Sequence, residues 1–118
     1  MEIPKHIISM KVEEAARQLD SLGNPIRLQI FRLLARAGET GLSVGTLQTR
    51  MDMAASTLSH HLKRLIEAGL VTQERAATTL VCRAVHAGIW ALISYLKDEC
   101  CADEARSLDC GAPVAKAG

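Results

Sequence analysis

Two adjacent cysteines near the C-terminal end of the chain have the chemistry to bind a thiophilic ion. Cys100 and Cys101 are followed nine residues later by Cys110. Thiolates are soft ligands that select soft ions, and trivalent arsenic and antimony take three sulfur ligands in a pyramid. The three cysteines therefore predict a site for As(III) or Sb(III), in which Cys110 folds back to complete the pyramid.

The backbone around this pair limits how both sulfurs can reach one ion. Neighbouring side chains on an α-helix point about 100° apart, so Cys100 and Cys101 must lie at the frayed end of a helix. Nearby carboxylates raise thiol pKa values, which disfavours a fast redox nucleophile, whereas a bound ion drives deprotonation itself. The alternative is three tail cysteines without a role, although exposed thiols are usually avoided. We interpret Cys82 as a small buried apolar side chain.

A second group of chemically capable residues lies between Ala54 and Leu70. Apolar residues at i, i+4, i+7 and i+8 spacing predict a helix whose other face is polar. That polar face carries Ser56, Thr57, Ser59, His60, Lys63 and Arg64. Short polar side chains let a helix approach base edges in the major groove, and the cations behind them reach phosphates. The alternative for this face alone is a solvated amphipathic helix.

The segments around this helix predict how it is held. Asn24 and Pro25 begin a helix that ends at Gly38, and Ser43 caps a shorter helix and is itself a candidate DNA contact. A helix, a tight turn and a second, polar-faced helix form a helix-turn-helix. The β-branched segments 70–75 and 79–83 predict a hairpin, or wing, after it. Arg75 and Arg83 on this wing are candidate contacts to the DNA backbone.

The two ends of the predicted domain have apolar helix faces that need a partner. Apolar residues recur at helical spacing from Val12, and a last helix from about Ala87 to Cys100 is apolar nearly all round. A helix of the latter kind must be buried on two sides, and in a domain this small one side fits a second subunit. The predicted dimer interface comprises Leu19, Trp90, Leu92, Ile93 and Leu96.

The composition fits one helical domain and no enzyme. The 118 residues are 48% hydrophobic but only 3% aromatic, which predicts an aliphatic core, and the net charge is +1. Residues 25–84 hold eight basic and four acidic side chains, which makes this segment the candidate nucleic-acid surface. No catalytic constellation, membrane-spanning run or signal peptide is found, so we expect a cytoplasmic protein without membrane contact.

These patterns define a mostly α-helical fold with a small β-hairpin: a winged helix-turn-helix that dimerises through its first and last helices. We expect residues 1–11 to be an N-terminal segment, residues 12–101 to be the DNA-binding and dimerisation domain, and residues 102–118 to be a flexible tail carrying Cys110.

Three motifs resemble one protein family. They are Leu-Gly-Asn-Pro-Ile-Arg-Leu at residues 22–28, Thr-Leu-Ser-His-His-Leu-Lys at 57–63 and Glu-Ala-Gly-Leu-Val at 67–71. In this order and spacing they resemble the ArsR–SmtB repressors, which are small dimeric winged-helix metalloregulators. The resemblance implies a homodimer built from the first and last helices, double-stranded operator DNA with inverted repeats, and release of that DNA when an inducer binds.

The sequence departs from the two standard ion sites of this family. The Cys-x-Cys of the founding arsenic sensors would fall within residues 42–47, which hold no cysteine, and no second His follows His86 and Asp98 as in the zinc sensors. Some members instead carry an arsenic site made of an adjacent cysteine pair and a later cysteine, and this chain resembles that subgroup.

The predicted function is therefore a repressor released from its operator by As(III) or Sb(III). Methylarsenite, which needs only two thiolates, is a further candidate inducer. Two alternatives stay open: a repressor of the same fold that senses zinc, cadmium or thiol redox state, and a dimeric interaction module that binds no DNA.

Overall fold

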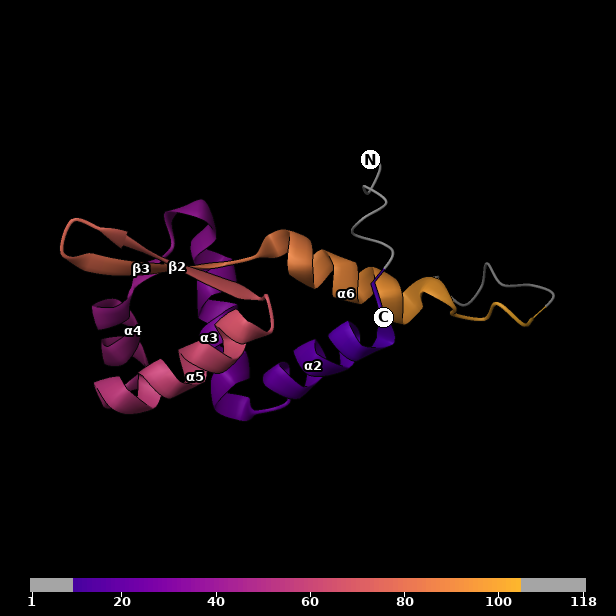
Figure 1. Ribbon diagram of the computed structural model, residues 1–118, viewed down its shortest axis with the longest axis horizontal. Coiled ribbons are helices and arrows are strands. Elements are labelled where there is room, and N and C mark those ends of the chain that lie inside the picture. Colours follow the sequence, from indigo (N-terminus) through magenta and orange to yellow (C-terminus); the bar gives the residue numbers. More distant parts are fainter. Residues whose placement is uncertain (1–9, 105–118) are drawn as a thin grey trace, which may run out of the picture.

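The computed structural model describes residues 10–104, which fold into five α-helices and a small antiparallel sheet (Figure 1). The helices are α2 (Val12–Leu22), α3 (Pro25–Ala37), α4 (Val44–Met51), α5 (Ala55–Glu67) and α6 (His86–Asp98). The strands are β1 (Leu42–Ser43), β2 (Val71–Ala76) and β3 (Thr79–Ala84), and a 3-10 turn, η1, covers Gly38–Thr40. The mostly α-helical fold with a β-hairpin is thus confirmed. In the described part of the chain, no helix has the length and apolarity needed to cross a membrane.

Local sequence signals set the beginnings of α3 and α4. The Asn24 side chain accepts a hydrogen bond from the backbone N–H of Arg27 at 3.0 Å, and Pro25 occupies the first helical position. The Ser43 hydroxyl accepts one from the backbone N–H of Thr46, also at 3.0 Å. Both caps satisfy N–H groups that a helix leaves without a partner. The predicted starts of these two helices are therefore confirmed.

The sheet contains one strand that the sequence pattern did not indicate. Its strand order is β1-β3-β2, with Leu42 paired to Cys82 and Ser43 to Val81. The sequence pattern predicts only a helix cap at Ser43, but the backbone of Leu42 and Ser43 also extends the hairpin by a third strand. Gly41 makes this possible, because its φ is +71° and a Cβ atom there would lie 2.5 Å from the carbonyl oxygen of Cys82.

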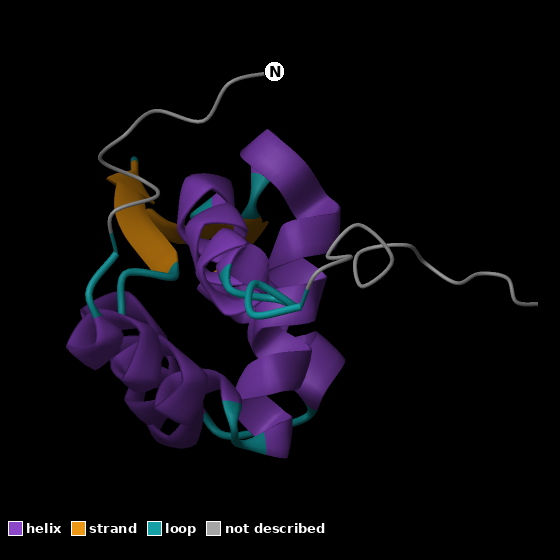
Figure 2. Ribbon diagram, turned by 90° about the vertical axis from the view of Figure 1, so that its right-hand side faces the viewer, coloured by secondary structure: helices purple, strands orange, loops and turns teal. Residues whose placement is uncertain are grey.

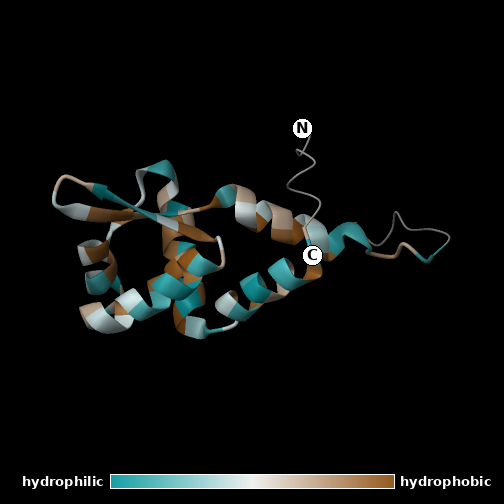
Figure 3. Ribbon diagram, in the orientation of Figure 1, coloured by the Kyte–Doolittle hydropathy of each residue, from teal (hydrophilic) through white to brown (hydrophobic). Residues whose placement is uncertain are grey.

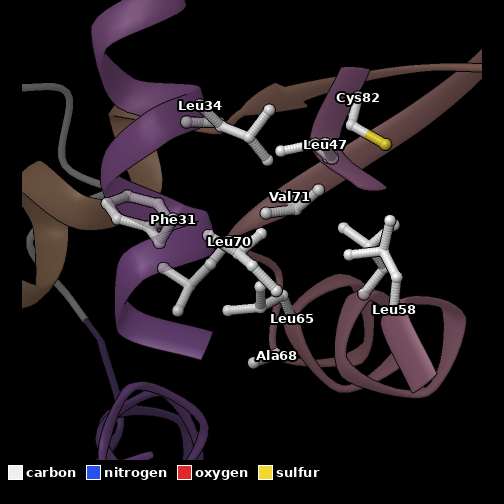
Figure 4. Close-up of a cluster of buried hydrophobic side chains, with 12 residues drawn as sticks. Phe31, Leu34, Leu47, Leu58, Leu65, Ala68, Leu70, Val71 and Cys82 are labelled. Atoms are coloured by element: carbon white, nitrogen blue, oxygen red, sulfur yellow. The ribbon is translucent and has the colours of Figure 1, made fainter. Parts of the chain in front are cut away.

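An aliphatic core joins α3, α4 and α5 to the sheet (Figure 4). Ile30, Leu34, Leu47, Leu58 and Leu65 are fully buried, and Leu70 and Val71 continue the cluster into β2. Cys82 is also fully buried, and burial raises the pKa of its thiol more than the Gln73 amide, 3.5 Å away, lowers it. The interpretation of Cys82 as an apolar core side chain is confirmed.

The helix α2 does not bury the face that its apolar spacing indicated. Val12 and Leu19 remain 59% and 44% exposed, whereas Ala15, Gln18 and Ser21 are buried. This helix contacts the rest of the chain with small and polar side chains, because Gln18 and Ser21 donate hydrogen bonds to the end of α5. Val12 and Leu19 are left on the outside.

Candidate nucleic-acid interface and thiol site

The helix α5 separates an apolar face from a polar one. Leu58, Leu62 and Leu65 pack into the core, and the opposite face is open to solvent. The exposed residues are Ser56, Thr57, Ser59, His60, Lys63 and Arg64. The structure therefore places all six predicted contacts of this helix on the surface, with α4 packed behind its N-terminal half (Figure 1).

A cavity of about 410 Å³ brings two further predicted DNA contacts together. It lies between the N-terminus of α4 and the hairpin, and its lining includes Ser43, Gly45 and Arg75. A helix N-terminus with exposed N–H groups attracts phosphate, and Arg75 adds a cation with a bidentate donor fork. Thr78 and Thr79 also line this cavity. The sequence pattern places Thr78 in the turn and Thr79 in the second strand of the hairpin, and their hydroxyl groups at the wing tip were the available signal.

Two other predicted contacts are engaged within the protein. Arg83 donates from Nε to the Glu39 carbonyl oxygen at 2.7 Å, and its guanidinium forms an ion pair with Glu74 at 2.5 Å. Arg64 lies 3.5 Å from the carboxylate of Asp20 on α2. Arg83 thus ties β3 to β2 and η1, while both groups of the Arg64 pair remain substantially exposed.

The C-terminal end of α5 is held by contacts with both α2 and the start of α6. The Gln18 side chain donates from Nε2 to the Ala68 carbonyl oxygen at 3.1 Å, a buried bond between residues 50 positions apart. On the other side, the Val85 backbone N–H donates to the Leu70 carbonyl oxygen at 2.8 Å. Gly88 packs so closely there that a Cβ atom would lie 3.0 Å from the Gly69 carbonyl oxygen.

His61 lies on the inner side of α5 in a cationic environment. Burial lowers the pKa of its imidazole, and the positive charges of Arg27, His60 and Arg64 lower it further. Its Nδ1 atom is buried without a hydrogen-bond partner among the described residues. Protonation of His61 is therefore disfavoured in the native state.

The helices α2 and α6 lie side by side and project from the rest of the domain (Figures 1 and 2). Along much of α6 the ribbon carries hydrophobic residues (Figure 3). Trp90, Ile93 and Leu96 are 60%, 40% and 55% exposed, respectively. Leu92, which we had also placed at the dimer interface, is only 2% exposed and packs inside its own protomer. The exposed apolar residues of these two helices are Val12 and Leu19 on α2 and Trp90, Ile93 and Leu96 on α6.

The adjacent cysteines follow α6 directly. The helix ends at Asp98, two residues earlier than expected, and the backbone N–H of Cys100 donates to the Lys97 carbonyl oxygen. Cys101 has a φ of +59°, and this left-handed residue turns the chain so that the two Sγ atoms lie 4.0 Å apart. Cys110 lies outside the described residues, and within residues 10–104 no three His, Cys, Asp or Glu side chains gather as a metal site.

A helix-turn-helix followed by a β-hairpin, with a polar exposed face on the second helix, defines a winged helix-turn-helix protein of the DNA-binding class. A family model described as a helix-turn-helix domain matches residues 22–74. The Biofilm growth-associated repressor of Agrobacterium fabrum is 36% identical over 103 residues, which are 87% of this chain and 86% of the relative. The chain belongs to the ArsR–SmtB family of winged-helix transcriptional regulators.

Solved structures of similar proteins have the same fold. One is a homodimeric winged helix-turn-helix DNA-binding domain, Mb0332 from Mycobacterium bovis, described as a possible ArsR-family regulator. It matches with a TM-score of 0.60 and 32% identity over 75% of this chain and 82% of that chain. Another, a possible transcriptional regulator for arsenical resistance, matches with a TM-score of 0.60 and 31% identity over 82% and 97% of the two chains. These matched proteins are transcriptional regulators, not enzymes.

Proposed function

We propose that this protein is a homodimeric repressor that As(III) or Sb(III) releases from operator DNA by binding Cys100, Cys101 and Cys110. The observation that carries the proposal is the 4.0 Å approach of the two Sγ atoms in the turn after α6. In the reduced chain, two soft sulfurs at this position offer two of the three ligands that a trivalent arsenic ion takes, and soft ions prefer them to oxygen donors. Such a repressor acts on chromosomal DNA in the cytoplasm.

Operator binding is assigned to the exposed face of α5 together with the cavity beside the wing. Ser56, Thr57, Ser59 and His60 face base edges, and Lys63 faces the backbone. Ser43 and Arg75 hold a phosphate at the N-terminus of α4, where the helix dipole favours an anion. Arg64 reaches a phosphate from its exposed ion pair with Asp20. Arg83 does not contact the DNA backbone itself but holds the wing in the shape that does.

Dimerisation is assigned to the exposed apolar face of α2 and α6. Monomeric proteins rarely leave such side chains clustered on one surface, and the similar Mb0332 domain is homodimeric. A dimer of this kind presents two recognition helices related by a two-fold axis, which suits an operator with inverted repeats about one DNA turn apart.

The experiment measures release from DNA with the full, reduced chain. A duplex selected by the protein from a random-sequence pool is labelled, and its fluorescence anisotropy is followed while arsenite is added. We expect the wild type to leave the duplex, whereas Cys100→Ser and Cys101→Ser remain bound. Cys82→Ala is the matched control, because this buried thiol is remote from the pair, and it should respond like the wild type. Arsenite that leaves the wild type on DNA contradicts the proposal.

A second comparison separates inorganic from methylated arsenic. Arsenite offers three exchangeable positions and methylarsenite two, so a third thiolate matters only for the former. Cys110→Ser should lose its response to arsenite and antimonite but keep its response to methylarsenite. A normal arsenite response by Cys110→Ser would remove Cys110 from the site, and the third ligand would then come from elsewhere.

The same assay decides between this proposal and the alternatives. Release by zinc or cadmium but not by arsenite would identify a different ion sensor. Release by a thiol oxidant alone, reversed by a reductant, would identify a redox sensor. A wild type that binds no duplex from the pool would identify an interaction module.

A further inference from the structure

A cavity between α3 and α4 is lined by three arginines and no carboxylate. Its volume is about 410 Å³, and its lining residues are Gln29, Arg32, Leu33, Arg36, Arg50 and Met51. Arg32 and Arg36 are four residues apart on α3 and therefore share one helix face, while Arg50 reaches the same cavity from the last turn of α4. Leu33 and Met51 supply apolar lining between the cations.

Three other arginines of the fold interact with neighbouring residues. Arg27 donates to the Ser21 carbonyl oxygen, Arg64 pairs with Asp20, and Arg83 contacts Glu74 and the Glu39 carbonyl oxygen. Among the described residues, none of the three cavity arginines makes an ion pair or a side-chain hydrogen bond. The fold thus brings like charges together and supplies no counter-charge.

We propose that this cavity, here called the α3–α4 arginine site, binds a phosphate group of the operator backbone. Guanidinium forks match the geometry of a phosphate oxyanion, which accepts two parallel N–H bonds from each. A tetrahedral dianion or a phosphodiester neutralises the repulsion that the fold otherwise leaves among Arg32, Arg36 and Arg50. The inference deepens the proposed operator binding and rests on it.

The position of the site favours DNA as the source of this phosphate. Arg50 lies two residues before Asp52, where the turn into α5 begins, so the site lies beside the N-terminal end of the recognition helix. The cavity with Ser43 and Arg75 lies at the opposite end of α4, where residues of the hairpin also line it. Eight helical residues span about 12 Å, which matches the width of the major groove, about 12 Å. The length of α4 between the two sites is thus comparable to the width of one groove.

The test removes the three cations and measures the salt dependence of operator binding. Each neutralised phosphate contributes about 0.9 to the slope of log K against log salt. The dimer of Arg32→Ala/Arg36→Ala/Arg50→Ala should therefore lose about two units of slope, one per protomer, and roughly 10- to 100-fold in affinity at 0.1 M salt. This variant should lose the same fraction of its affinity for the selected duplex as for unrelated duplexes, because a phosphate carries no sequence information.

Two control proteins separate a local contact from net charge. Lys11→Ala/Arg17→Ala/Lys97→Ala removes the same charge from exposed positions outside the cavity and should change the slope by much less than the first variant. Arg32→Lys/Arg36→Lys/Arg50→Lys keeps the charge but loses the forks, and should recover most of the slope with part of the affinity. Circular dichroism and sedimentation verify that each variant is folded and dimeric.

A titration of the DNA-free dimer with inorganic phosphate distinguishes a free anion from the operator backbone. If the arginine variant loses operator affinity and slope as stated, the proposal is supported. If inorganic phosphate saturates the site while operator binding is unchanged in the variant, the assignment to DNA is overturned. If the wild type binds the duplex, the arginine variant binds it equally well, and inorganic phosphate does not bind the dimer, the site is overturned altogether. A wild type that binds no duplex refutes the proposed function instead.

Discussion

Replacing Gln18 with methionine tests whether α2 holds the end of the recognition helix. Gln18 is only 4% exposed, and its amide N–H donates to the Ala68 carbonyl oxygen at 3.1 Å. Methionine keeps the length of the side chain but has no donor, so the Ala68 carbonyl is left buried without this hydrogen bond. A buried polar group left in this state costs about 1–3 kcal/mol.

One feature of the native contact reduces the expected loss. The Gln18 Oε1 atom has no hydrogen-bond partner among the described residues, and methionine removes this buried oxygen as well. The net decrease in the free energy of unfolding should therefore fall near the lower end, about 1 kcal/mol, which corresponds to a Tm decrease of about 4–8 °C for a domain of this size.

The assay is urea and thermal unfolding followed by circular dichroism, at one fixed protein concentration because a dimer's stability depends on it. Gln29→Met on the exposed surface of α3 is the control for stability alone, because Gln29 lines the α3–α4 arginine site, and it should unfold like the wild type. Gln18→Met should also bind the selected duplex more weakly, since the C-terminal end of α5 is less well held. Unchanged stability together with unchanged operator affinity would refute the conclusion that the Gln18 hydrogen bond holds the end of α5.

The remaining predictions concern the dimer and the pH dependence. Ile93→Lys should give monomers by sedimentation that no longer bind the operator, because an unpaired charge buried in the interface costs several kcal/mol; a folded Ile93→Lys dimer would contradict the assignment of this face. The pKa of His61 is held below its ordinary value of 6.5 by burial and then by Arg27, His60 and Arg64. As the pH falls below 6.5, the unfolded chain takes up this proton before the native protein does, so the free energy of unfolding falls. His61→Gln should reduce that fall between pH 6.5 and 5, and an equally steep fall in the variant would exclude His61 as its source.

The parts of the fold that could be predicted are those encoded by local signals. Asn24, Pro25 and Ser43 have the types and positions that begin helices, and each does so here. The spacing of Leu58, Leu62 and Leu65 determined which face of α5 would be buried, so the opposite, polar face followed directly. Two β-branched segments were sufficient to predict the hairpin, although its turn carries Ala77 with a φ of +59° rather than a glycine.

The parts that could not be predicted depend on contacts between distant segments. Leu42 forms a strand only because β3 is there to pair with it, and nothing within residues 38–43 signals that partner. Gln18 is buried because the end of α5 offers a carbonyl oxygen 50 positions away. Leu92 fits an interface by its type, but α6 turns it inward and leaves Trp90 and Ile93 outside. The convergence of Arg32, Arg36 and Arg50 likewise depends on the fold, which brings α3 and α4 to the same cavity.

The distance between the two candidate sites constrains how an inducer would act. The cysteine pair follows the last turn of α6, whereas the first turn of α6 contacts the end of the recognition helix. Thirteen helical residues separate these two ends of α6 by about 20 Å. An ion at the cysteines therefore cannot touch the DNA-binding face, and its effect must travel through α6 as a rigid element. At the other end, a Cβ atom on Gly88 would lie only 3.0 Å from the Gly69 carbonyl oxygen, so α6 packs closely on the turn after α5 and a shift of α6 would act on that turn. Because Gln18 ties the same turn to α2, both helices of the proposed interface converge on the end of the recognition helix, and a rearrangement of the dimer would alter its position through either one.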